Sequence, residues 1–128
     1  MNKLEQLKTM TTVVADTGDI RAIKQYRPID ATTNPSLVLK AAKLPVYRNL
    51  LEQAVSINGQ QANNRQKWIR QCADQLAINI GVEIINHIPG RISTEVDARL
   101  SFDRQKTIKR AMEIVEGYSM AGGLQTGY

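Results

Sequence analysis

The chain has 128 residues, of which 42% are hydrophobic and 23% charged, a composition typical of a single ordinary globular domain. Residues 1–12 alternate charged and apolar side chains and lack the apolar core of a secretory or transit peptide, and no apolar run approaches the ~20 residues that cross a bilayer. Cys72 is the single cysteine, so an internal disulfide is excluded and a buried thiol is its expected role. We therefore expect a cytoplasmic protein that makes no membrane contact.

The net charge of +5 raises the hypothesis of nucleic-acid binding, because a basic surface attracts phosphate. The distribution of charge argues against it. Lysines and arginines are spread along the chain, and the densest stretch, residues 103–110, contains no aromatic side chain on which a base could stack. We read this stretch as a solvated helix face and expect no nucleic-acid partner.

Short β-rich segments alternate with longer segments of helical apolar spacing, a pattern that predicts a βα architecture. Pro45 stops one helix, and Gly59 ends the next. In chain order the predicted elements are a β segment at 11–15, a helix at 20–26, a β segment at 31–33, helices at 37–42 and 47–55, a long helix from about 63 to 87, a β segment at 91–98 and a helix at 108–118.

The long predicted helix carries one apolar face over several turns. Trp68 and His87 lie beside this face, and we interpret Trp68 as a packing residue and His87 as a polar residue near the helix end. The chain has no second histidine to complete a metal pair, so we expect no metal site. The residues of the predicted face are Ile69, Cys72, Ala73, Leu76, Ile80 and Ile84.

Three polar residues end or interrupt the three β segments, at the position where parallel βα proteins bind their ligands. They are Asp16, Asn34 and Glu95. The segment 91–98 alternates with period two, so if its apolar face meets the helices, Glu95 points the other way, into a barrel. A buried carboxylate without a partner costs several kcal/mol, which favours a role such as general acid–base catalysis.

Each of these residues also has a purely structural interpretation. Asn34 before a proline matches a helix N-cap. Asp16 precedes a turn and could bond to its backbone amides. Glu95 could form a salt bridge to Arg91 or Arg99. The residues alone predict a βα-repeat protein with a possible polar site and name no reaction.

Residues 11–19, 30–37 and 90–101 resemble signature segments of the transaldolases, in the right order and spacing, and the likeness runs from about Leu4 to Tyr118. This resemblance implies an α/β fold of the (β/α)₈ TIM-barrel type. Residues 1–128 would form a single partial barrel domain with about the first three βα units, well under half of a complete family member. The glycine-rich tail, residues 121–128, departs from the family pattern.

The resemblance also implies a function. Transaldolases move a dihydroxyacetone unit between sugar phosphates in the non-oxidative pentose phosphate pathway, through a lysine Schiff base and without cofactor or metal. The donors are sedoheptulose 7-phosphate and fructose 6-phosphate, and the acceptors glyceraldehyde 3-phosphate and erythrose 4-phosphate. By resemblance, Asp16 handles proton transfer at the substrate hydroxyl, Glu95 acts through a water in making and breaking the imine, Asn34 bonds to the dihydroxyacetone chain, and Thr32 supports the site.

The family's Schiff-base lysine lies on the fourth strand, which this chain does not reach. None of its eight lysines falls on a predicted β segment, and a lysine on a helix face stays hydrated and protonated. We therefore expect the chain to be inactive alone. The alternative is a non-catalytic interaction fragment that pairs with a complementary or full-length subunit, and open barrel edges also predict self-association. A basic nucleic-acid binder is the third hypothesis.

Overall fold

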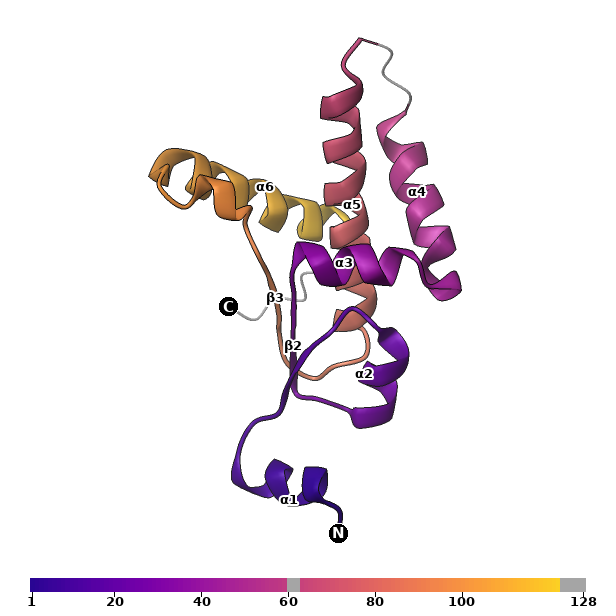
Figure 1. The fold of residues 1–128 in the computed structure, drawn as a ribbon, viewed down its shortest axis with the longest axis vertical. Coiled ribbons are helices and arrows are strands. Elements are labelled where there is room, and N and C mark those ends of the chain that lie inside the picture. The colour runs from indigo at the N-terminus through magenta and orange to yellow at the C-terminus, as the bar shows by residue number, and fades with distance from the viewer. Residues whose placement is uncertain (60–62, 123–128) are drawn as a thin grey trace.

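The computed structural model describes residues 1–59 and 63–122 (Figure 1). Helices and strands alternate as the sequence predicts, and three short strands form one parallel sheet. The strands are β1 (Val14–Asp16), β2 (Asp30–Thr33) and β3 (Ile92–Thr94). The helices are α1 (Lys3–Met10), α2 (Ile20–Tyr26), α3 (Pro35–Ala42), α4 (Arg48–Asn58), α5 (Arg65–Ile85) and α6 (Arg104–Met120), with single 3₁₀ turns η1 (Pro45–Tyr47) and η2 (Ala98–Leu100).

The three strands lie in the order β1-β2-β3, with β2 in the centre. Asp16 is level with Thr32, and Thr32 is level with Ser93, so these three side chains share one face of the sheet. The opposite face carries Ala31, which is buried, and Ile92. Helical core residues pack against that second face.

The core lies between the covered face of the sheet and the helices. The long helix α5 contacts α2, α3, α4, α6 and β3, and Figure 1 shows α4 beside it as an antiparallel partner. The buried core residues are Ile20, Ile23, Ala31, Ala41, Tyr47, Ala54, Leu76, Ile80, Ile84 and Ile88. The prediction of a buried thiol is confirmed, since Cys72 is buried in α5.

Two sequence predictions were wrong in detail, and one helix was not predicted. The strand predicted at 91–98 ends at Thr94, because β3 pairs with β2 over only three positions and Asp97 instead caps η2 through the amide of Arg99. Ile69, placed on the core face of the long helix, is 48% exposed, and Ala73 of the same predicted face is also exposed. The segment before β1 forms α1, whose Asn2 and Glu5 make a reciprocal capping box.

Two hydrogen bonds, one to Asp30 and one from Gly90, fix the start of β3 beside β2. The Asp30 carboxylate accepts a hydrogen bond of 2.7 Å from the amide of Arg91, and the amide of Gly90 donates to the carbonyl of Ile29 at 2.9 Å. A Cβ at Gly90 would overlap the Asp30 carboxylate and lie 2.6 Å from the Ile29 carbonyl oxygen. Only glycine therefore allows the two chains to approach this closely.

Two negative findings hold for residues 1–59 and 63–122. No helix in these ranges is long and apolar enough to cross a membrane. No group of three or more histidine, cysteine, aspartate or glutamate side chains in the same ranges could hold a metal ion. Ala121 and Gly122 of the predicted tail form a turn, and residues 123–128 of that tail lie outside the described residues.

Candidate functional site

The three polar residues predicted to end the β segments lie at one edge of the sheet. Asp16 is the last residue of β1, Asn34 directly follows β2, and Glu95 directly follows β3. Because the strands are parallel, all three stand at the carboxyl edge, where open and closed βα sheets bind their substrates. The structure thus brings the backbones of the three candidates to a common edge.

The face of the sheet opposite the helical core carries the polar side chains. Asp16, Ser93 and Glu95 are exposed and Thr32 is half-buried. The Thr32 hydroxyl donates a hydrogen bond of 2.9 Å to the Asp16 carboxylate, which ties β1 to β2 at the level of the site. Thr32 therefore orients the carboxylate of Asp16 directly.

Asp16 does not act as a turn carboxylate, the structural role considered for it. Asp19 caps α2 instead, accepting from the amide of Arg21 at 2.9 Å. The hydrogen bond from the Arg21 side chain lowers the pKa of Asp19. Thr17 completes the turn, since its hydroxyl accepts from the amide of Asp19 at 3.0 Å. The carboxylate of Asp16 is thereby left to the polar face.

Asn34 does cap a helix, as its structural interpretation predicts. Its side-chain oxygen accepts a hydrogen bond of 3.0 Å from the amide of Leu37, and Pro35 occupies the first turn of α3. The side-chain nitrogen of Asn34 makes no hydrogen bond with any residue that the structure describes. One half of the amide thus holds the helix, and the other half is a donor available to a ligand.

Glu95 does not form either salt bridge considered for it. Arg99 is held by Asp97, with nitrogen–oxygen distances of 2.5–3.0 Å, and these hydrogen bonds lower the pKa of Asp97 to about 2. Arg91 makes its described hydrogen bonds through its backbone amide and carbonyl. Within the described ranges, the Glu95 carboxylate has no hydrogen-bonding partner and is free to meet a substrate or a water.

Every lysine of the chain is exposed, and each lies in a helix or, for Lys43, at a helix cap. None is on a strand. A lysine nucleophile must lose its proton near neutral pH, which requires removal from water. The described residues therefore supply acid–base and hydrogen-bonding groups at the carboxyl edge but no desolvated amine.

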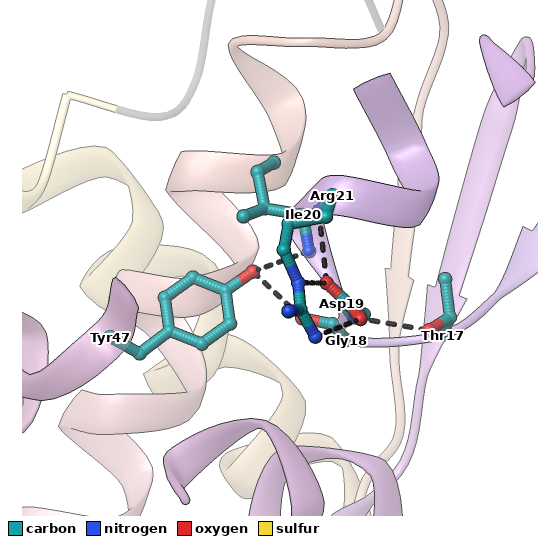
Figure 2. Close-up of polar contacts among 6 residues, drawn as sticks. All are labelled: Thr17, Gly18, Asp19, Ile20, Arg21 and Tyr47. Carbon is teal, nitrogen blue, oxygen red and sulfur yellow. Dashed lines mark hydrogen bonds and ion pairs between the residues drawn. The ribbon is translucent and has the colours of Figure 1, made fainter. Parts of the chain in front are cut away.

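Two buried tyrosines hold the strand ends, and the sequence analysis missed both. The Tyr47 hydroxyl donates to the carbonyl of Gly18 at 2.7 Å and accepts from the amide of Ile20 at 3.1 Å (Figure 2). The Tyr118 hydroxyl lies 2.6 Å from the hydroxyl of Thr94. A tyrosine among otherwise apolar helical positions was the available signal, because a buried hydroxyl requires a partner.

The fold and the site define a parallel βα protein that presents two carboxylates and an amide at the carboxyl edge of its strands. Residues 13–122 match the family described as Transaldolase/Fructose-6-phosphate aldolase, and the chain belongs to this family. The family implies a TIM-barrel fold.

Similar curated proteins are named transaldolases. The transaldolase of Shewanella sp. (strain ANA-3) is 58% identical over 121 residues, which cover 94% of this chain and 38% of the relative. The transaldolases of Shewanella putrefaciens (strain CN-32 / ATCC BAA-453) and Aeromonas salmonicida (strain A449) are 57% and 56% identical, with the same coverage of both chains. The chain thus spans 38% of the length of these relatives.

Proposed function

We propose that this chain supplies the N-terminal part of a transaldolase active site. The whole protein would transfer a dihydroxyacetone unit between sugar phosphates through a lysine Schiff base, and the three βα units described here would be the first part of its barrel. The observation that carries the proposal is the placement of Asp16, Asn34 and Glu95 at one carboxyl edge, in a chain 58% identical to a transaldolase.

The polar residues suit the steps of this reaction. A lysine amine condenses with the ketose carbonyl to give an imine and release water, and Glu95, free of an ion-pair partner, would move the protons through a bound water. Asp16 would then accept the proton of the hydroxyl β to the imine carbon as the carbon–carbon bond breaks and the aldehyde leaves. The Asn34 side-chain nitrogen would donate to a hydroxyl of the retained three-carbon unit.

We further propose that the 128-residue chain does not catalyse this reaction alone. Its lysines are all exposed, and none lies on a strand beside Asp16 or Glu95. Removing the covalent nucleophile from such an enzyme removes the route itself. Borohydride treatment with fructose 6-phosphate should therefore trap no adduct on this chain, and a stoichiometric adduct on any of its lysines would contradict the proposal.

The positive test uses a fusion protein, in which residues 1–120 are followed by the part of the Shewanella sp. (strain ANA-3) transaldolase beyond the matched region. We expect this fusion protein to transfer dihydroxyacetone from fructose 6-phosphate to erythrose 4-phosphate. Asp16→Asn should lower its kcat by about 10²–10⁴-fold. The matched control is Asp103→Asn, which keeps the side-chain oxygen that caps α6 and should leave kcat unchanged. An inactive fusion protein that is folded would refute the proposed function.

A second candidate function is non-catalytic association, favoured by an uncovered apolar row on α6. Ile108, Met112 and Val115 lie one turn apart, and each is at least 45% exposed. We expect the isolated chain to associate through this row, and Met112→Lys should shift it toward monomer in sedimentation experiments. An isolated chain that is a monodisperse monomer would exclude this candidate.

A further inference from the structure

The loop that follows the first site carboxylate is held from inside the core by one side chain. Tyr47 comes from η1, its side chain is 1% exposed, and its hydroxyl reaches the backbone of the loop between β1 and α2 (Figure 2). It donates to the carbonyl of Gly18 at 2.7 Å and accepts from the amide of Ile20 at 3.1 Å. One hydroxyl therefore bonds both sides of Asp19.

These two bonds satisfy groups that the helix itself leaves unpaired. Ile20 is the first residue of α2, where an amide has no intrahelical acceptor. Asp19 and Thr17 complete the turn through their own hydrogen bonds, so the segment from Thr17 to Ile20 is fixed along its length. Asp16 directly precedes this segment, so these bonds restrain the backbone next to the residue that carries the carboxylate.

A second tyrosine contacts the end of the third strand through a side chain. Tyr118 in α6 is 6% exposed, and its hydroxyl lies 2.6 Å from the hydroxyl of Thr94, the last residue of β3. A Cβ at Gly81 would overlap the Tyr118 hydroxyl, so a glycine in α5 leaves the space that this contact needs. Glu95 is the next residue along the chain.

Packing alone does not explain these hydroxyls, because phenylalanine would fill nearly the same volume without burying a polar group. Burial raises the pKa of Tyr47 to about 12 and also raises that of Tyr118. Both hydroxyls therefore stay protonated at any pH at which the protein would work, and Tyr47 remains a donor to Gly18.

We propose that Tyr47 and Tyr118 are positioning residues, Tyr47 for the carboxylate of Asp16 and Tyr118 for that of Glu95. This inference rests on the proposed function. Each tyrosine acts through a different carboxylate, and the two carboxylates serve different steps. Loss of the Tyr47 hydroxyl should therefore slow cleavage of the carbon–carbon bond, whereas loss of the Tyr118 hydroxyl should slow formation of the imine.

The experiment measures both steps in the fusion protein defined above. One readout is the initial rate at which borohydride fixes fructose 6-phosphate to the protein, which reports imine formation, and the other is kcat for transfer to erythrose 4-phosphate. For Tyr47→Phe we expect kcat to fall about tenfold or more while the trapping rate stays within about twofold, because a small displacement of a catalytic group costs up to about 10²-fold. For Tyr118→Phe we expect the trapping rate itself to fall about tenfold.

Second variants remove a restraint on each of the same two segments without changing a core aromatic ring. Thr17→Val deletes the acceptor for the Asp19 amide and should repeat the direction of Tyr47→Phe, and Thr94→Val should repeat that of Tyr118→Phe. Ile80→Val is the control for lost stability, since Ile80 is fully buried in α5 and belongs to the hydrophobic core. Ile80→Val should leave both rates unchanged even where it lowers the melting temperature as much as the tyrosine variants do.

The inference is overturned if Tyr47→Phe lowers the trapping rate as much as kcat, if Tyr118→Phe leaves the trapping rate unchanged, or if Ile80→Val reproduces their pattern. If the unsubstituted fusion protein neither traps nor transfers, the proposed function fails, and the positioning is decided on the 128-residue chain by NMR. There Tyr47→Phe should speed hydrogen exchange at the Ile20 amide and move the carboxylate carbon resonance of Asp16, whereas Tyr118→Phe should move that of Glu95. Unmoved carboxylate resonances would overturn the positioning role.

Discussion

Replacement of Gly81 by alanine should destabilise the protein, although the same change in an ordinary helix stabilises it. Gly81 lies in the interior of α5, where alanine is normally favoured by about 1 kcal/mol. Here the added Cβ would overlap the Tyr118 hydroxyl and lie 2.7 and 2.9 Å from two ring carbons of the same side chain. The ring is buried and cannot move aside without losing its contact with Thr94.

The opposing contributions give a net loss of stability. Forcing a methyl group into an occupied core costs about 1–3 kcal/mol, and breaking the Tyr118–Thr94 hydrogen bond costs about 1 kcal/mol more. After the propensity gain of about 1 kcal/mol is subtracted, the free energy of unfolding should fall by about 1–3 kcal/mol. At roughly 4 °C per kcal/mol for a domain of this size, the melting temperature should drop by about 4–12 °C.

The assay is urea and thermal unfolding followed by circular dichroism, with Gly117→Ala as the matched control. Gly117 is also helical, but its added Cβ would meet only the terminal carbon of Ile78 and, at 3.5 Å, the carbon before it, and this flexible side chain can rotate away. Gly117→Ala should therefore be neutral or stabilising by up to about 1 kcal/mol. Tyr118→Phe should partly rescue Gly81→Ala. A Gly81→Ala protein as stable as the parent would refute the packing argument.

Three further results are expected. Hydrogen bonds from Arg99 lower the pKa of Asp97 from 3.8 to about 2, so this carboxylate stabilises the fold above about pH 4 and the stabilisation is lost as pH falls through about 2. Asp97→Asn should therefore weaken the dependence of the melting temperature on pH between about 4 and 2. An unchanged dependence on pH would count against the pairing of Asp97 with Arg99. Gly90→Ala should lower the free energy of unfolding by about 1–3 kcal/mol in urea titrations, because the Ile29 carbonyl it meets is backbone and cannot turn away; a neutral effect would contradict this. Asn34→Asp should keep the melting temperature, since the capping oxygen remains, but raise the KM of the fusion protein for fructose 6-phosphate; an unchanged KM would remove Asn34 from the substrate site.

Local sequence signals located most of the elements correctly. The helix at 20–26 and the Asn34 cap before Pro35 are confirmed, because a helix start depends on side chains within three residues of it. The order of strands and helices also placed Asp16, Asn34 and Glu95 at corresponding strand ends, since alternating βα units make neighbouring strands parallel. The catalytic roles assigned to these residues stay predictions.

The tertiary structure decided what depends on partners distant in sequence. The period-two pattern extended the third strand to residue 98, but β3 ends at Thr94, because a strand is only as long as the neighbour that pairs with it. Helical spacing placed Ile69 in the core, but the core ends before that turn of α5. The Tyr47 hydroxyl finds its acceptor 29 residues away and that of Tyr118 its partner 24 residues away, distances over which a local pattern carries no information. The sequence therefore determined which polar groups reach the carboxyl edge of the sheet, and long-range packing alone decided what holds them there.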